Sequence, residues 1–209
     1  DFNDKCWLGT PEEFYELFAV TAKHLKSRFP ELKIGGPAVC GFNEKWLRPF
    51  FEKMRSENVP MDFYSWHRYG SCVADFTDDA RRHRALLDEF GYTEAESILD
   101  EWNYVRGWSG EEWKNSLQTE LSMKGAAMIS AVMAACQREA VDMLMYYDAR
   151  INSTMNGLFS FGTLEPLKGC HALSAWGELL AAGDECKTEC DVPDIYAAGD
   201  CAMVHNRIT

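Results

Sequence analysis

The feature that most constrains the fold is a regular alternation between segments of helical periodicity and short apolar segments. In the helical segments, apolar side chains recur every three or four residues, as on one face of an α-helix. The short segments are mostly apolar, as in strands that helices cover. The order is typical of a parallel β/α architecture. Predicted helices cover residues 11–29, 43–58, 78–90, 111–138 and 167–180, and predicted strands cover residues 32–34, 61–67, 96–104 and 142–148.

Local signals mark where several of these elements begin and end. Thr10 precedes Pro11 and is followed three residues later by Glu13, a spacing that predicts a capping box at a helix start. Asn43 is expected to open the second helix. The Gly-Gly-Pro sequence at residues 35–37 is expected to end the first strand.

Two parallel architectures fit this order: an open doubly wound sheet and the second half of a (β/α)₈ barrel. No Gly-rich phosphate loop opens a predicted helix, which weighs against a nucleotide-binding open sheet. Polar and aromatic residues gather where the predicted strands end, and in a barrel that end carries the active site. They are Trp66, His67, Tyr69, Glu101, Trp102, Asn103, Tyr146, Tyr147 and Asp148.

Glu101 is the most informative of these residues. It follows the apolar pair Ile98 and Leu99, so its carboxyl group lies where a buried strand approaches the mouth of the sheet. A carboxylate is expensive to bury there unless it is paired or hydrogen-bonded. Its position alone is compatible with a solvated loop residue or a helix cap, and equally with a nucleophile or general base.

The segment Leu99-Asp-Glu-Trp-Asn-Tyr104 resembles the nucleophile strand of retaining glycoside hydrolases with a (β/α)₈ barrel, nearest to the β-xylosidase group of family thirty-nine. Residues 14–37 and 62–70 resemble the fourth helix, fifth strand and sixth strand of that group. The resemblance implies that the chain holds strands five to eight, the C-terminal half of the barrel. Residues 1–183 would then be a partial catalytic barrel, and residues 184–209 a linker and the start of a small β-rich accessory segment.

The resemblance also implies a two-carboxylate mechanism with Glu101 as nucleophile. Family members carry the acid/base Glu in an Asn-Glu-Pro motif, and no such motif occurs in this sequence. Asp1 and Phe2 are expected to follow that motif in a longer parent protein. The fragment alone is therefore expected to have little or no glycosidase activity, because one of two cooperating carboxyl groups is missing.

The same resemblance implies substrate-binding roles around Glu101. His67 is expected to hydrogen-bond the substrate or the nucleophile, and Tyr69 to donate its hydroxyl to Glu101. Core packing is the alternative for each aromatic residue. Tryptophans in the predicted loops are further candidates for sugar stacking. The expected substrate-binding residues are Trp66, His67, Tyr69, Trp102, Asn103 and Tyr147, and the loop tryptophans are Trp7, Trp108 and Trp113.

Composition excludes several other classes of function. The net charge of −12 disfavours nucleic acid as a partner. No window approaches the roughly 18 apolar residues of a membrane span. The 8 cysteines are spread along the chain without the paired spacing of a metal site, which favours reduced thiols and a cytoplasmic location. No metal or organic cofactor is implied, because two carboxylates suffice for glycoside hydrolysis.

Two alternative functions remain beside the glycosidase. A degenerate, non-catalytic homologue would bind carbohydrate without cleaving it. A barrel isomerase or aldolase would need a Lys or a metal cluster at strand ends, and Lys33 lies inside a predicted strand. The expected partner is a carbohydrate substrate, with no nucleic acid or membrane partner, and the exposed strand edges of a half barrel predict self-association.

Overall fold

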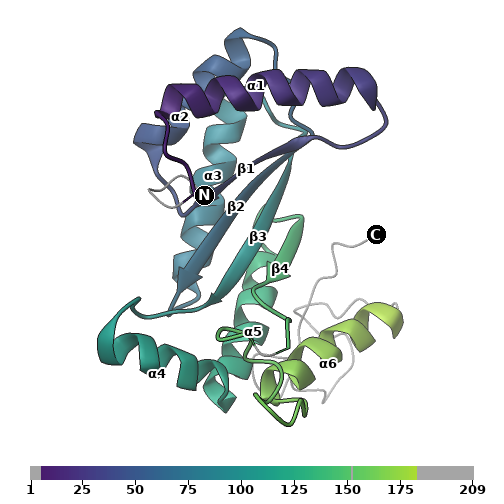
Figure 1. The fold of residues 1–209 in the computed structure, drawn as a ribbon. Coiled ribbons are helices and arrows are strands. Elements are labelled where there is room, and N and C mark those ends of the chain that lie inside the picture. The colour runs from purple at the N-terminus through teal and green to yellow at the C-terminus, as the bar shows by residue number, and fades with distance from the viewer. Residues whose placement is uncertain (1–5, 152, 183–209) are drawn as a thin grey trace.

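A parallel four-stranded sheet runs through the middle of the molecule (Figure 1). The computed structural model describes residues 6–151 and 153–182. The strands lie side by side in chain order, each parallel to its neighbours. They are β1 (Gly35–Cys40), β2 (Phe63–Gly70), β3 (Glu96–Tyr104) and β4 (Met143–Tyr146). The α/β class with a parallel sheet is therefore confirmed.

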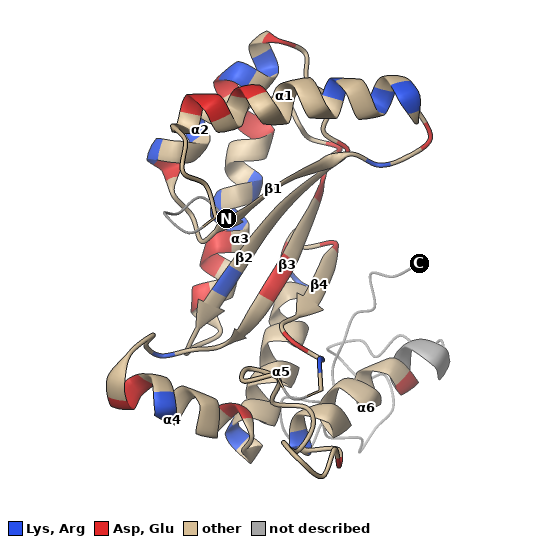
Figure 2. Ribbon diagram, in the orientation of Figure 1, with Lys and Arg blue, Asp and Glu red and all other residues tan. Residues whose placement is uncertain are grey.

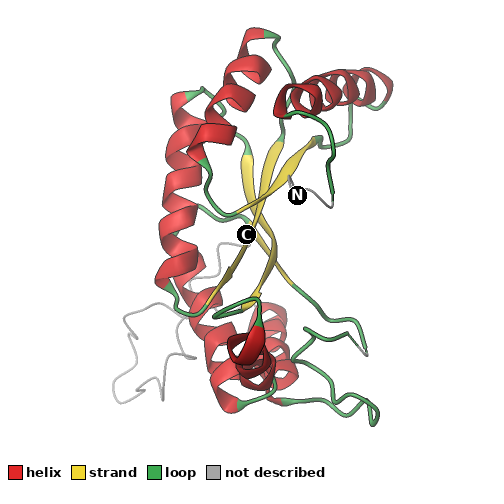
Figure 3. Cartoon of the chain, turned by 60° about the vertical axis from the view of Figure 1, so that its left-hand side comes forward, coloured by secondary structure: helices red, strands yellow, loops and turns green. Residues whose placement is uncertain are grey.

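Helices connect the strands and pack along the sheet (Figure 3). They are α1 (Pro11–Arg28), α2 (Glu44–Ser56), α3 (Ala74–Glu89), α4 (Gly110–Glu120), α5 (Met123–Cys136) and α6 (Lys168–Ala182). Helix α3 contacts β2 and β3, and α5 contacts β3, while α1 packs on α2 and α6 on α5. Among the described residues, no helix is both long enough and apolar enough to cross a membrane.

The predicted helix starts at Thr10 and Asn43 are confirmed. The Thr10 hydroxyl accepts a hydrogen bond from the Glu13 backbone N–H, and the Glu13 carboxylate accepts one from the Thr10 N–H. This is a complete capping box at the start of α1. The Asn43 side chain accepts from the Trp46 N–H and caps α2. Both ends depend on contacts within one turn, which is why the sequence pattern predicts them.

The expectation of a first strand at residues 32–34 is wrong. The strand is β1, which begins at Gly35 and contains the Gly-Gly-Pro sequence that was expected to end it. β1 lies at an edge of the sheet, where a proline is tolerated. A Cβ on Gly35 would lie 2.0 Å from the Phe63 carbonyl oxygen of β2, so glycine is required by the close approach of these two strands.

The expectation of one long helix over residues 111–138 is also wrong. The segment forms two helices, α4 and α5, with a break at Leu121 and Ser122. The Ser122 hydroxyl accepts a hydrogen bond from the Lys124 N–H and starts α5 as its N-cap.

Helix α3 begins earlier than expected, at Ala74, where the Asp75 carboxylate accepts hydrogen bonds from the backbone N–H groups of Ser71 and Cys72.

A β-bulge at Asp100 decides which way the second half of β3 faces. Leu99 pairs with Trp66 on β2, and Glu101 pairs with His67, so Asp100 has no partner on β2. Side chains alternate between faces along a regular strand, and one extra residue reverses the alternation. Leu99 and Trp102 therefore both face the helices, while Glu101 faces the opposite side. We call that opposite side, which carries His67 and Glu101, the site face.

The hydrophobic core lies between the sheet and the helices. Its largest side chains come from α2, β2, α3 and β3, and include Phe50, Phe51, Tyr64, Trp66, Phe76 and Trp102. Arg68 of β2 is on the same side, where its guanidinium lies 3.4 Å from the Asp79 carboxylate of α3. The core thus fixes one face of β2 and β3, and the alternate residues of both strands are presented on the site face. The predicted linker and β-rich segment, residues 184–209, lie outside the described residues.

Candidate active site

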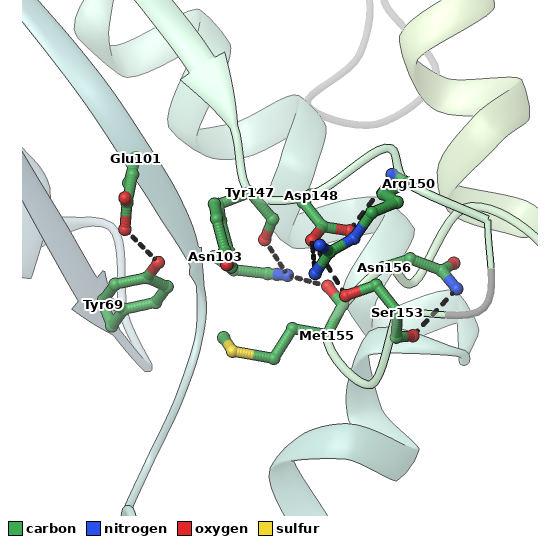
Figure 4. A network of polar contacts seen from close by, with 9 residues as sticks. All are labelled: Tyr69, Glu101, Asn103, Tyr147, Asp148, Arg150, Ser153, Met155 and Asn156. Atoms are coloured by element: carbon green, nitrogen blue, oxygen red, sulfur yellow. Dashed lines mark hydrogen bonds and ion pairs between the residues drawn. The ribbon is translucent and has the colours of Figure 1, made fainter.

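Glu101 and Tyr69 form a hydrogen-bonded pair across β2 and β3 (Figure 4). The Tyr69 hydroxyl donates to the Glu101 carboxylate at 2.7 Å, and both side chains are half-buried. Burial and then the hydrogen bond with Glu101 raise the pKa of Tyr69 above its ordinary value of 10.0. Tyr69 therefore stays a neutral donor, able to hold the carboxylate in one orientation. The contact expected from the sequence is present.

His67 lies directly opposite Glu101 in the register of β2 and β3. Its imidazole is 5% exposed, and its Nδ1 atom lies 3.5 Å from the Asp100 carboxylate. Burial alone would lower the pKa of His67, but contacts with Asp100 and Cys40 raise it to about 9. The imidazole is therefore cationic at neutral pH. Figure 2 shows acidic residues on β3 beside β2. The acidic residues of β3 include Asp100, whose carboxylate lies 3.5 Å from the imidazole, and Glu101, which pairs with His67 in the strand register.

Asn103 ties β3 to the segment that follows β4 (Figure 4). Its amide nitrogen donates to the Tyr147 carbonyl at 2.7 Å and to the Met155 carbonyl at 2.8 Å. Its amide oxygen accepts from the Tyr104 N–H at 2.7 Å. Both amide hydrogens are thus used by backbone carbonyls, and the side chain is buried. Asn103 positions the Tyr147 backbone relative to Glu101.

The segment after β4 is held together by its own polar side chains. The buried Asp148 carboxylate accepts from the Ser153 hydroxyl at 2.8 Å and from the Arg150 N–H at 3.1 Å. The Asn156 amide oxygen accepts from two backbone N–H groups further along. The Tyr147–Asp148 peptide bond is cis. This segment presents the half-buried Tyr147, whose ring lies nearly perpendicular to the Tyr69 ring at a centroid distance of 6.3 Å.

Trp66 and Trp102 do not join this group. Trp66 is fully buried, with its ring 4.7 Å from that of His83 on α3. Trp102 is 2% exposed and packs against Phe76 of α3. Both face the helices because of the strand alternation and the bulge at Asp100. Of the residues singled out from the sequence, the structure brings Glu101, His67, Tyr69 and Tyr147 together, with Asn103 behind them.

Sequence reasoning missed three residues with unusual surroundings. Asp100 and Cys40 contact His67, and the adjacent acids Asp100 and Glu101 were a signal for the first of these. Glu120 of α4 is 1% exposed, and within the described residues neither of its carboxylate oxygens has a hydrogen-bond partner. Burial and then the charge of Asp148 raise the pKa of Glu120 to about 8. No sequence signal separates this glutamate from an exposed helical one.

The arrangement suits nucleophilic chemistry on a polyhydroxylated substrate. Glu101 is an oriented carboxylate, and Tyr69, Tyr147 and the His67 cation supply donors and ring surfaces around it. Across the described ranges, no set of three or more His, Cys, Asp or Glu side chains is arranged to hold a metal ion. These residues equip the Glu101 carboxylate to act as a covalent nucleophile or to stabilise a positive charge on the substrate.

Comparison with known families gives one match over most of the chain. The model described as glycosyl hydrolases family 39 matches residues 1–146. This range includes the whole of β1 to β4 and the Tyr69–Glu101 pair.

Individual relatives and a solved structure agree with this match. A β-xylosidase from Geobacillus stearothermophilus is 42% identical over 60 residues, which are 29% of this chain and 12% of the relative. A β-xylosidase from Caldicellulosiruptor saccharolyticus is 32% identical over 86 residues, which are 41% of this chain and 17% of the relative. The crystal structure of a glucosidase from Croceicoccus marinus superposes with a TM-score of 0.66 at 26% identity, covering 87% of this chain and 39% of the glucosidase chain. The matched part of this chain is thus well under half the length of each of these proteins.

Proposed function

This chain belongs to glycosyl hydrolases family 39, and from that premise we propose that it carries the nucleophile of a retaining glycosidase of β-xylosidase type, with Glu101 as the attacking residue. The observation that carries the proposal is the 2.7 Å hydrogen bond from Tyr69 to Glu101 on the site face. It gives a strand carboxylate a fixed orientation beside a cationic imidazole. Such an arrangement is expected for a nucleophile and unnecessary for a surface glutamate.

In this mechanism Glu101 acts in two steps. Its carboxylate attacks the anomeric carbon of a xyloside, and the bond from that carbon to the leaving-group oxygen breaks as the glycosyl ester forms. A second carboxyl group protonates the departing oxygen and then removes a proton from the water that hydrolyses the ester, so the anomeric configuration is retained. No Asn-Glu-Pro motif occurs in the sequence, so no residue of the described chain is given that second role.

Tyr69 and His67 prepare Glu101 for attack. The Tyr69 hydroxyl donates to one carboxylate oxygen, leaving the other for the sugar. Protonated His67 lies opposite Glu101 in the strand register and 3.5 Å from Asp100, so it places a positive charge beside the attacking group. Tyr147 supplies a ring surface at the edge of the sugar site, and Asn103 fixes the Tyr147 backbone. Trp66 and Trp102 support β2 and β3 from the helix side.

We assign the four strands to positions five to eight of a (β/α)₈ barrel, with residues 1–183 as its catalytic part. The parallel order β1-β2-β3-β4 supports this assignment. So does the superposition of 87% of this chain on 39% of a glucosidase chain. In a barrel of this kind, residues near the carboxyl ends of the strands form the active site, which is where Tyr69 and Glu101 lie.

The decisive experiment traps the glycosyl ester on Glu101. The probe is a dinitrophenyl β-xyloside with fluorine in place of the hydroxyl group next to the anomeric carbon. Dinitrophenolate leaves without protonation, so the probe needs no general acid, and the fluorine slows hydrolysis of the ester. We expect one fluoroxylosyl adduct on the peptide containing Glu101, identified by mass spectrometry, and none on Glu101→Gln.

The matched control is Asp100→Asn, which removes the neighbouring carboxyl group and leaves Glu101 in place. It should still form the adduct on Glu101. An adduct on another residue of the wild-type chain, or none on a chain whose circular dichroism shows it to be folded, would refute the assignment. Xylose binding without an adduct would instead support a non-catalytic carbohydrate-binding homologue.

A further inference from the structure

Cys40 is an exposed cysteine without a disulfide at the end of β1. It pairs with His67 in the register of β1 and β2, and His67 pairs with Glu101 on β3. The preceding row, which includes Val39 and Trp66, packs in the core, so alternation along the strands places the Cys40 row on the site face. A thiol, an imidazole and a carboxylate therefore share one row across three neighbouring strands (Figure 1).

The contacts of His67 connect the Cys40 thiol to an acidic residue. The imidazole contacts both Cys40 and the Asp100 carboxylate, and its Nδ1 atom lies 3.5 Å from that carboxylate. A sulfur nucleophile beside an imidazole that a third group orients is the arrangement found in activated cysteines. Only the thiolate form of a cysteine attacks, and a neighbouring imidazolium stabilises that form. The row thus contains the parts of a reactive thiol.

Cys72 provides a comparison within the same chain. It is also exposed and without a disulfide, but its side chain hydrogen-bonds the Asp75 carboxylate in the first turn of α3. A carboxylate neighbour disfavours an anionic thiolate, whereas a cationic neighbour favours it. Two exposed thiols of this chain therefore have direct contacts of opposite charge, and the one with the cationic contact lies on the site face.

We propose that Cys40 is a modification site, at which a low-molecular-weight disulfide forms a mixed disulfide with the chain. The Cys40 sulfur attacks one sulfur of the disulfide, and a new sulfur–sulfur bond forms as the original one breaks. The other half leaves as a thiol and takes up the proton that Cys40 gave up, so Cys40 is oxidised and the departing sulfur is reduced. The His67 cation stabilises the negative charge on the attacking and the departing sulfur.

The group added to Cys40 would lie beside Glu101. Neighbouring strands are about 4.8 Å apart, so about 10 Å, the span of two strand spacings, separates the two backbones. An extended tripeptide such as that of glutathione is also about 10 Å long, and it reaches across this distance. Modification would therefore close the sugar site, and a reducing thiol would open it again. This consequence, unlike the reactivity of Cys40, rests on the proposed function.

The test treats the chain with glutathione disulfide at neutral pH and follows the modified peptides over time by mass spectrometry. We expect Cys40 to react about tenfold faster than Cys72. His67→Gln should slow Cys40 to the rate of Cys72 and leave Cys72 unchanged, whereas a general disturbance of the fold would change both rates. His24→Gln, at an exposed position of α1, is the matched control and should leave both rates at the wild-type values.

Labelling with the fluoroxyloside then tests whether modification closes the sugar site. The chain carrying glutathione on Cys40 should form no adduct on Glu101, and dithiothreitol should restore the adduct. In Cys40→Ser, labelling should be the same with and without prior treatment with glutathione disulfide.

The outcomes separate the modification site from the proposed nucleophile. Equal rates at Cys40 and Cys72, or a Cys40 rate that His67→Gln leaves unchanged, would overturn the modification site. Full labelling of Glu101 in the modified chain would overturn the closure. Rapid, His67-dependent modification of Cys40 in a chain that is never labelled on Glu101 would support the modification site and refute the nucleophile.

Discussion

At the residue scale, the candidate site depends on a few side chains whose surroundings change their acid–base behaviour. Tyr69 remains protonated beside Glu101, and His67 is protonated beside Asp100. Glu120 is different, because it is buried without a hydrogen-bond partner among the described residues and is expected to be neutral. Each of these states follows from burial and contacts, and each can be tested by one substitution.

The hydrogen bond between Tyr69 and Glu101 predicts the effect of Tyr69→Phe. A hydrogen bond to a charged group contributes about 1.5–3 kcal/mol, so its loss should slow dinitrophenolate release from the fluoroxyloside roughly 10- to 100-fold. The measurement is the absorbance of the released phenolate. The matched control is Tyr104→Phe. The Tyr104 hydroxyl accepts a hydrogen bond from the Lys124 ammonium at 3.1 Å, so its removal does not affect the bond to Glu101. Release at the wild-type rate in Tyr69→Phe would show that the bond has no role in attack.

Glu120 predicts a pH dependence of stability. The folded-state pKa is about 8, against 4.5 for an ordinary glutamate, so the folded chain retains a proton that the unfolded chain releases between these values. The contribution is fully present below pH 4.5 and is lost as the pH rises through 8. In Glu120→Gln, we expect the fall in free energy of unfolding over this range to be smaller by about 2–4 kcal/mol.

Urea denaturation at the two ends of this pH range measures the effect. The exposed Glu112 on the same helix provides the matched control, and Glu112→Gln should show the same pH dependence as the wild type. Equal pH dependence in wild type and Glu120→Gln would mean that Glu120 is ionised in the folded chain.

At the element scale, the site depends on how neighbouring segments are joined. The bulge at Asp100 turns Glu101 to the site face while Leu99 and Trp102 stay in the core. Asn103 joins β3 to the segment after β4 through two backbone carbonyls. Strand register thus places Glu101 on the site face, where Tyr69 orients its carboxylate, and one buried amide positions the Tyr147 backbone.

The link made by Asn103 predicts a loss of stability in Asn103→Ala. The Tyr147 carbonyl would lose its donor, and an unsatisfied buried acceptor destabilises a fold by about 1–3 kcal/mol. The Met155 carbonyl would lose one of two donors and keep the bond from the Asp148 N–H at 3.3 Å. We expect the free energy of unfolding to fall by about 2–3 kcal/mol in chemical denaturation, with slower labelling of Glu101. Asn115→Ala, at an exposed position of α4, should change neither quantity. A variant with wild-type stability would show that the hydrogen bonds of Asn103 contribute nothing to the free energy of unfolding.

At the scale of the whole molecule, the parallel sheet has two edges among the described residues, β1 and β4. Met143 of β4 pairs with Ile98, and Met145 follows it on the same face of the strand. Their side chains are 46% and 45% exposed. Unpaired backbone groups beside exposed apolar side chains favour association with another chain.

This edge predicts that the 209-residue chain self-associates as its concentration rises. Met145→Lys places a charge on the edge strand and should shift the chain towards monomer, as measured by sedimentation velocity. Leu17→Lys alters a residue of α1 that is 51% exposed and should leave association unchanged. Monomeric behaviour of the wild type at every concentration tested would show that the edge is protected.

Local signals predicted much of the fold, and non-local contacts account for what they missed. Thr10 and Asn43 cap their helices through bonds within one turn, so the sequence pattern is sufficient. The start of β1 at Gly35 depends on its close approach to Phe63 of another strand, and no pattern within the segment records that distance. The break at Ser122 is a local cap that the apolar periodicity on both sides obscured.

The candidate site likewise contains residues that the sequence predicted correctly and residues whose place depends on non-local structure. Glu101, His67 and Tyr69 could be identified because their residue types recur at strand ends and resemble a known family, and the structure brings them together. Trp66 and Trp102 were predicted to bind substrate from the same resemblance, and both rings instead pack in the core. Alternation along β2 puts Trp66 and His67 on opposite faces, and the bulge at Asp100 that sends Trp102 to the core has no signature in the residue pattern.

The bulge makes the direction of Glu101 a matter of counting. Removing the single codon for Asp100 would restore uninterrupted pairing with β2 and still leave Glu101 opposite His67 on the site face, because Leu99 and Glu101 would then be neighbours in a regular strand. Asp100 is therefore the one spare residue of β3 between Leu99 and Glu101. An in-frame deletion of its codon should give a clone that is still labelled on the glutamate.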